Sequence, residues 1–180
     1  MLARFFLSQI PAISQIKTFT RIFVKKINMQ TLLVLHSIIR WLVLIFAFWT
    51  LFSALSGVLS KRNYTRADDK SNFFFMLSMD IQLLIGMILY FNGQWFERLK
   101  NLGDNMKDPA MRFFTLEHFL LMLIAWVLVH AGRIAVKKAA LPKSKFKKQF
   151  IYFGIALLLI LLAIPWPFRE AIIRPWIRWF

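Results

Sequence analysis

The chain has 180 residues, of which 59% are hydrophobic, 17% aromatic and only 18% charged. This composition excludes an ordinary soluble domain, in which charged residues make up about a quarter of the chain. The net charge of +16 would suit nucleic acid only on a soluble basic surface, so no nucleic-acid partner is expected. The absence of cysteine excludes disulfides, thiolate-bound iron–sulfur clusters and the covalent attachment of a c-type haem.

Residues 1–28 form a basic segment ahead of the first long apolar run. One interpretation is an amphipathic helix that lies on the membrane surface, with its basic side chains toward the headgroups. The other is an upstream extension of the reading frame, with the native start near Met29. The basic residues of this segment are Arg4, Lys17, Arg21, Lys25 and Lys26.

Four apolar windows come next, at about residues 31–59, 72–91, 113–136 and 150–164. A hydrocarbon core of about 30 Å is crossed by roughly 20 helical residues. Because lipid cannot satisfy exposed backbone groups, and because the runs do not alternate as barrel strands do, the spans must be helical. We therefore expect an all-α integral membrane protein, with an up-down-up-down four-helix bundle over residues 29–168 in contact with the lipid bilayer. Residues 169–180 are expected to form an external amphipathic tail.

The distribution of Lys and Arg predicts the orientation of this bundle. The connection at 131–149 is strongly basic and contains no acidic residue, whereas the connection at 94–113 mixes both charges. Short basic loops stay on the cytoplasmic side. The 131–149 loop is therefore predicted to be cytoplasmic, with both termini outside if the chain starts near Met29.

Ionisable residues inside spans are costly in lipid and therefore indicate functional sites. His36 and His118 both lie about 6–8 Å below the outer ends of their spans at 1.5 Å per residue. The first and third helices of such a bundle face each other diagonally, so two inward imidazoles there could ligate one b-type haem from both sides. Arg40, one turn from His36, could pair with a haem propionate. Met87 is a rival axial ligand.

The alternative is that His36 and His118 are interfacial side chains that bind headgroups or neighbouring carbonyls. A second polar cluster is expected in the inner half, where Asp80 could take His130 or Arg133 as its partner. This cluster would be a proton relay, a quinone-headgroup site or a structural hydrogen bond between helices.

Three sequence stretches carry a resemblance to a known group. They are Leu-His36-Ser-Ile-Ile-Arg40-Trp41, then Phe114-Thr-Leu-Glu117-His118 with His130-Ala-Gly-Arg133, and the terminal Pro165-Trp-Pro-Phe-Arg169. From about residue 29 to the end, the chain resembles small bacterial four-span membrane proteins labelled cytochrome b. The resemblance implies a b haem held by His36 and His118, electron transfer, and a bacterial inner membrane. A two-haem protein of the b561 type would need four suitably placed histidines, and this chain has three.

The expected function is therefore that of a cytochrome b-like electron-transfer protein with one bis-His haem b, or of a small subunit of a redox complex, and not of an enzyme by itself. A quinone or a redox protein would be its electron partner, and a homo-oligomer or a larger complex its assembly. Two alternatives stay open. One is a cofactor-free accessory or scaffold protein, and the other a proton-coupled transporter that uses Asp80 and His130.

Overall fold

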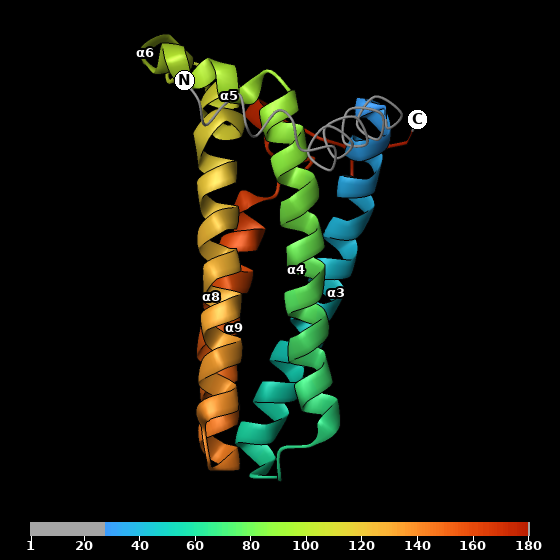
Figure 1. Cartoon of the computed structure of the whole chain (residues 1–180), viewed down its shortest axis with the longest axis vertical. Helices are drawn as coiled ribbons and strands as arrows, with labels where there is room; N and C mark the ends of the chain where they lie inside the picture. The colour runs from blue at the N-terminus through green and yellow to red at the C-terminus, as the bar shows by residue number, and fades with distance from the viewer. Residues whose placement is uncertain (1–27, 180) are drawn as a thin grey trace, which may run out of the picture.

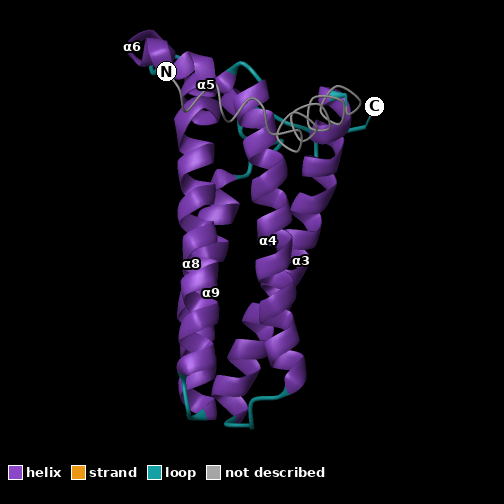
Figure 2. Ribbon diagram, in the orientation of Figure 1, coloured by secondary structure: helices purple, strands orange, loops and turns teal. Residues whose placement is uncertain are grey.

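The computed structural model describes residues 28–179 and consists of long helices that run side by side (Figure 1). The two expectations for the segment 1–28 lie outside the described residues, except for Asn28. Four long helices form the bundle, and no strand occurs between residues 28 and 179 (Figure 2). The expected all-α four-helix bundle is confirmed. The four are α3 (Met29–Ser60), α4 (Arg66–Asn92), α8 (His118–Lys138) and α9 (Pro142–Ala163).

Each helix packs on two neighbours in a closed ring. α3 packs on α4 and α9, and α8 packs on the same two helices, so α3 and α8 lie across the diagonal. Aliphatic and aromatic side chains from all four helices fill the centre, including Val43, Phe75, Val129 and Phe153, each at most 1% exposed. This ring brings residues of α3 and α8 together across the core without a long contact between the two helices.

Local start signals explain why two spans begin earlier than the apolar windows. α4 starts at Arg66 because Thr65 and Asp68 form a reciprocal capping box. α9 starts at Pro142, whose missing N–H is not needed in a first turn. The spans were expected to start at 72 and 150, after the charged residues. Their first turns are nevertheless helical, because Lys and Arg side chains can extend toward water from a helix end.

The third span is one continuous helical segment, Pro109–Lys138. It contains α7 (Pro109–Arg112), a π-helical turn η2 (Phe113–Glu117) and α8. Asp108 caps the start by accepting a hydrogen bond from the Met111 N–H at 2.8 Å. A π-turn inserts an extra residue and so rotates α7 relative to α8. The turn ends immediately before His118.

The two ends of the bundle differ. We call the end with the short connections 61–65 and 139–141 the loop end. The opposite end, called the tail end, carries α5 (Trp95–Arg98), η1 (Leu99–Asn101) and α6 (Leu102–Asn105), and it also carries the C-terminal tail, residues 164–179, with its short helix η3 (Glu170–Ile172).

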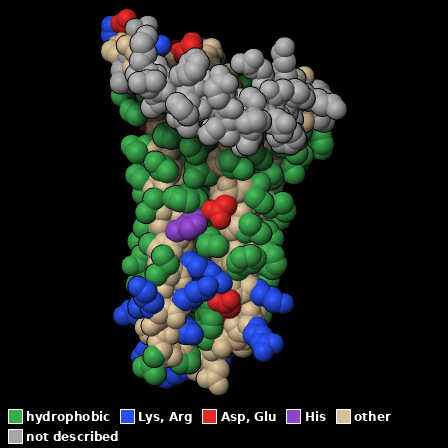
Figure 3. All heavy atoms as spheres, viewed as in Figure 1, with side chains coloured by type: hydrophobic (Ala, Val, Ile, Leu, Met, Phe, Trp, Pro, Cys, Tyr) green, Lys and Arg blue, Asp and Glu red, His purple; other side chains and the backbone are tan. Residues whose placement is uncertain are grey.

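All four long helical segments are long and apolar enough to cross a membrane. On the face drawn in Figure 3, apolar side chains predominate between the tail end and the middle of the bundle. A surface of this kind is stable only against lipid or another apolar surface. The chain is therefore a multi-pass membrane protein.

Candidate functional site

His36 of α3 and His118 of α8 meet across the diagonal of the bundle in its tail-end half. Their ring centroids lie 6.3 Å apart and the ring planes cross at 69°. Both side chains are partly buried. Sequence reasoning expected these histidines to be level and to face each other, and the structure brings them together in this way.

A backbone carbonyl fixes the protonation of His118. Its Nδ1 lies 2.7 Å from the Ala163 carbonyl oxygen at the end of α9. A carbonyl oxygen only accepts, so Nδ1 carries the proton and the neutral ring keeps its lone pair on Nε2. A hydrogen bond of this type orients histidines that ligate metals through the other ring nitrogen.

His36 is held by α4. The Gln82 amide nitrogen lies 3.1 Å from the His36 carbonyl oxygen and 3.2 Å from the ring Nε2. Since an amide nitrogen donates, Nε2 of His36 accepts and its Nδ1 carries the proton. One turn along α4, a Cβ on Gly86 would lie 3.2 Å from His36 Cε1. The glycine therefore allows the imidazole to pack closely against the α4 backbone.

Buried polar atoms without a partner gather around this histidine pair. Within residues 28–179 they include His36 Nδ1, Gln82 Oε1 and Arg40 Nε, and Thr115 Oγ1 lies three residues before His118. Buried polar groups in folded proteins nearly always have a hydrogen-bond partner, so each of these atoms indicates that a partner is missing. Elsewhere in the described chain, the same is true only of Thr50 Oγ1 and Asn72 Oδ1, which belong to the Gln149 cluster of the loop-end half.

Arg40 lies near the pair but binds the tail. Its guanidinium donates to the Trp176 carbonyl oxygen, which also accepts from Trp41 Nε1 at 3.0 Å. The tail was expected to be an external amphipathic segment. Two of its arginines stack on aromatic rings of the third span, Arg169 on Phe113 at 5.0 Å and Arg174 on Phe114 at 4.5 Å.

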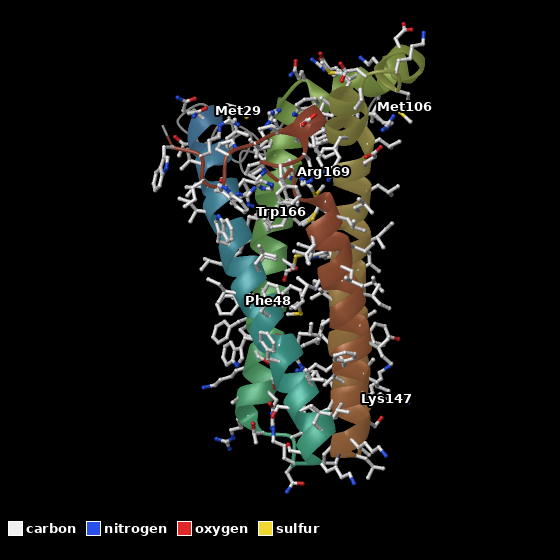
Figure 4. The ribbon with its side chains drawn as sticks, turned by 180° about the vertical axis from the view of Figure 1, so that it is seen from behind. Met29, Phe48, Met106, Lys147, Trp166 and Arg169 are labelled. Carbon is white, nitrogen blue, oxygen red and sulfur yellow. The ribbon has the colours of Figure 1, made fainter. Side chains whose placement is uncertain are left out.

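The tail therefore folds across the tail end of the bundle, from α9 toward the beginning of α3. Figure 4 shows the start of this path, with Trp166 and Arg169 between α9 and α3. Its hydrogen bonds to Ser37 and Arg40 place it next to His36 in the sequence of α3.

The second polar cluster also forms, with one change of partner. His130 Nε2 lies 3.3 Å from Asp80 Oδ1, and Trp126 Nε1 donates to the same oxygen at 2.7 Å. Arg133, the other candidate partner of Asp80, instead makes a two-pronged ion pair with Asp69 at 2.7 and 3.0 Å. Asp69 lies nearer the loop end, at the depth of Arg133, and this proximity decides the pairing.

Two further predicted residues stand apart from the histidine pair. Met87, the rival ligand, is 38% exposed on the surface of α4, and Gln82 and Gly86 face His36 in its place. Glu117 pairs with Arg112 at 2.6 Å beside a pocket of about 330 Å³ at the tail end.

Sequence reasoning missed four parts of the site: the Gln82 contact with His36, the Ala163 carbonyl, the close approach at Gly86 and the π-turn before His118. The first three depend on which helices become neighbours. A glycine inside an apolar span was the one available signal, because it often marks a close backbone approach.

The fold and this site define a multi-pass, all-α membrane protein with a histidine pair across its core. Within the described residues, no group of three or more His, Cys, Asp or Glu side chains could hold a metal ion by itself. Comparison of the chain with protein-family models, with curated proteins and with solved structures finds no match.

Proposed function

We propose that this protein is a cytochrome b-like membrane electron carrier, or the small subunit of a redox complex, and that it binds one haem b between His36 and His118. The observation that carries the proposal is the facing imidazole pair from diagonal helices, 6.3 Å between centroids, with unpartnered buried polar atoms around it. A bundle core between facing helices is a common place for such a cofactor.

The donor set fits a bis-histidine haem. His118 would be able to hold a haem iron through Nε2, because Nδ1 donates to the Ala163 carbonyl and Nε2 keeps its lone pair. His36 also has its lone pair on Nε2, which Gln82 now uses. Ligation would require Gln82 to release this atom, and the amide could still donate to the His36 carbonyl oxygen.

When bound, a haem iron supplies one-electron redox chemistry. The residues of this chain would tune and protect it. Arg40 places a positive charge one turn from His36, which favours the reduced iron and could pair with a propionate. Phe113, only 2% exposed and 5.8 Å from the His118 ring, helps to keep water from the pair.

We further propose a bacterial inner membrane as the location, with the 131–149 connection cytoplasmic and the tail end outside. Support comes from the basic side chains that gather toward the loop end (Figure 3). Electrons would be exchanged with a quinone or a redox protein at the membrane surface.

The test is an absorbance spectrum of the purified, detergent-solubilised protein, with haem supplied during expression. We expect a Soret band that shifts on dithionite reduction and an α band of b type, at about one haem per chain. His36→Ala and His118→Ala should each abolish the bound pigment. His130→Ala is the matched control and should keep it. A folded wild-type protein without pigment, or loss of pigment in His130→Ala alone, would overturn the proposal.

A second candidate function is proton-coupled transport, and the Asp80–His130 contact favours it. Trp126 O accepts from His130 Nδ1 at 3.1 Å, so the 3.3 Å contact between His130 Nε2 and Asp80 must share one further proton. In proteoliposomes under a pH gradient, wild-type protein should then carry a proton flux that Asp80→Asn abolishes. A flux that Asp80→Asn leaves unchanged would exclude this candidate.

A further inference from the structure

The pair Asp80 and His130 lies on the outside of the bundle, near the middle of α4 and on the adjacent α8. The two side chains are 38% and 31% exposed, although they contact each other. In Figure 3 a His side chain lies beside an Asp or Glu side chain on this face, with apolar side chains around and above them and Lys or Arg side chains toward the loop end. Their outward-facing atoms would therefore meet hydrocarbon if lipid covered this face.

Lipid is a poor neighbour for such a pair, because the exposed part of an ionisable group finds no hydrogen-bonding partner in the bilayer. The Asp80 carboxylate accepts one hydrogen bond, from the Trp126 Nε1–H. Its other oxygen, Oδ2, has no hydrogen-bond partner among residues 28–179. A polar group from another protein surface at this depth would satisfy it.

The surroundings of the pair have the properties of a helix–helix interface in a membrane. Apolar side chains are exposed on both helices, one turn above and one turn below the polar spot. Interhelical polar contacts within an otherwise apolar surface hold membrane helices together. The face, here called the α4/α8 face, comprises Asp80 and His130 together with Leu77 and Leu84 on α4 and Val127 and Ile134 on α8.

Symmetry indicates what covers this face. Two copies inserted with the same orientation are related by a twofold axis along the membrane normal, which conserves depth. If this axis runs in front of the line where α4 and α8 meet, α4 of each copy contacts α8 of the other copy. Asp80 and His130 share one depth, because they contact each other within a copy. Each Asp80 then lies beside the His130 of the other copy, whose Nε2–H can be shared between the two carboxylates because its contact with its own Asp80 is long, at 3.3 Å.

We propose that a second copy of this chain docks on the α4/α8 face, with two symmetric Asp80–His130 contacts at the centre of the interface. In a twofold interface the same surface of both copies is in contact, so that surface must carry groups that complement each other, as Asp80 and His130 do. The inference does not depend on haem and would hold for any of the functions considered above.

Cysteine crosslinking tests the proposal directly, since the chain has no native cysteine and each variant carries a single thiol. Two differently tagged variants are co-expressed and oxidised in membranes. α4 and α8 run in opposite directions, so Leu84→Cys and Val127→Cys both lie on the tail-end side of the pair. Ile134→Cys lies on the loop-end side.

We expect the level-matched couple, Leu84→Cys with Val127→Cys, to form a disulfide-linked heterodimer. The mismatched couple, Leu84→Cys with Ile134→Cys, should form little, and so should Leu158→Cys alone on exposed α9. Equal crosslinking of matched and mismatched couples, or none above the Leu158→Cys level, would overturn the proposal and leave lipid as the neighbour of this face.

Removal of the polar contact gives a second readout. Asp80→Asn in the matched couple should lower the crosslinked fraction about tenfold, because two symmetric contacts are lost together. Circular dichroism confirms that the variant stays helical. Unchanged crosslinking in this helical variant would show that Asp80 is not at the interface.

Discussion

The orientation of His36 depends on two residues of α4 that lie one turn apart. Gln82 supplies a hydrogen bond to the ring, whereas Gly86 leaves room for it, since a Cβ there would lie 3.2 Å from His36 Cε1. Residues four apart share one helix face. The same face of α4 therefore both binds the imidazole and limits the volume available to it.

The Gly86→Leu substitution tests this packing. The added side chain must displace His36, so we expect the free energy of unfolding to fall by about 1–3 kcal/mol, as overpacked cores show. Bound haem per chain, measured by absorbance, should fall with it if His36 is a ligand. Gly103→Leu is the matched control, because nothing lies within 4 Å of its Cβ position. Full pigment and stability in Gly86→Leu would contradict the packing argument.

The depth of the two histidines in the bundle was predictable from the sequence, whereas the residues that contact their rings were not. His36 and His118 were expected to be level because a helix rises by a constant amount per residue. The partners of these rings come from α4 and from the end of α9, and no local pattern specifies such contacts. Arg133 illustrates the limit, since both Asp69 and Asp80 are on α4 and only the relative shift of α4 and α8 selects Asp69.

At the scale of the element, Asp68 determines where α4 begins. Its carboxylate accepts from the Thr65 N–H at 2.7 Å and from both terminal nitrogens of Arg62 at 2.7 Å, and Ser53 of α3 also donates to it. The hydrogen bonds from Arg62 to Asp68 raise the pKa of Arg62 above its ordinary value, so the guanidinium stays charged. One side chain thus caps α4, orders the turn and ties α3 to α4.

Asp68→Asn should therefore be destabilising. The Asp68 side chain is only 4% exposed and its partner Arg62 33%. Removing one charge of such a pair leaves the other poorly compensated, and we expect a loss of about 2–3 kcal/mol after allowance for the exposure of Arg62. Asp104→Asn breaks an exposed pair with Lys107 and should change stability by less than about 0.5 kcal/mol. Thermal unfolding in detergent measures both, and equal effects would contradict the assignment.

The apolar runs predicted the number of spans and their middles, but not all of their ends. The Thr65–Asp68 spacing is a readable start signal, and it places the beginning of α4 correctly where hydropathy alone did not. The π-turn at Phe113–Glu117 has no such signal. Its residues would suit an α-helix equally well, and the packing around it selects the wider turn.

At the scale of the whole molecule, the tail joins the last helix to the first. Arg40 and Trp41 both donate to the Trp176 carbonyl, the Arg178 N–H donates to Ser37 Oγ at 3.1 Å, and Gln30 donates to the Trp179 carbonyl at 3.2 Å. The sequence predicted an external amphipathic tail here. It could not show that backbone carbonyls of the tail would satisfy donors on α3.

Deletion of residues 169–180 tests this connection, and Arg40 makes the test specific. The deletion removes the Trp176 acceptor and leaves the guanidinium of Arg40 without it, which should cost about 1.5–3 kcal/mol in addition to the lost packing of the tail. Arg40→Met removes the donor, so in the shortened chain it should recover part of the lost stability. In the full-length chain it should be destabilising. Thermal unfolding of the four proteins gives a double-mutant cycle, and we expect a coupling of about 1 kcal/mol or more. Additive effects would mean that the tail stabilises the bundle without the Arg40 contact.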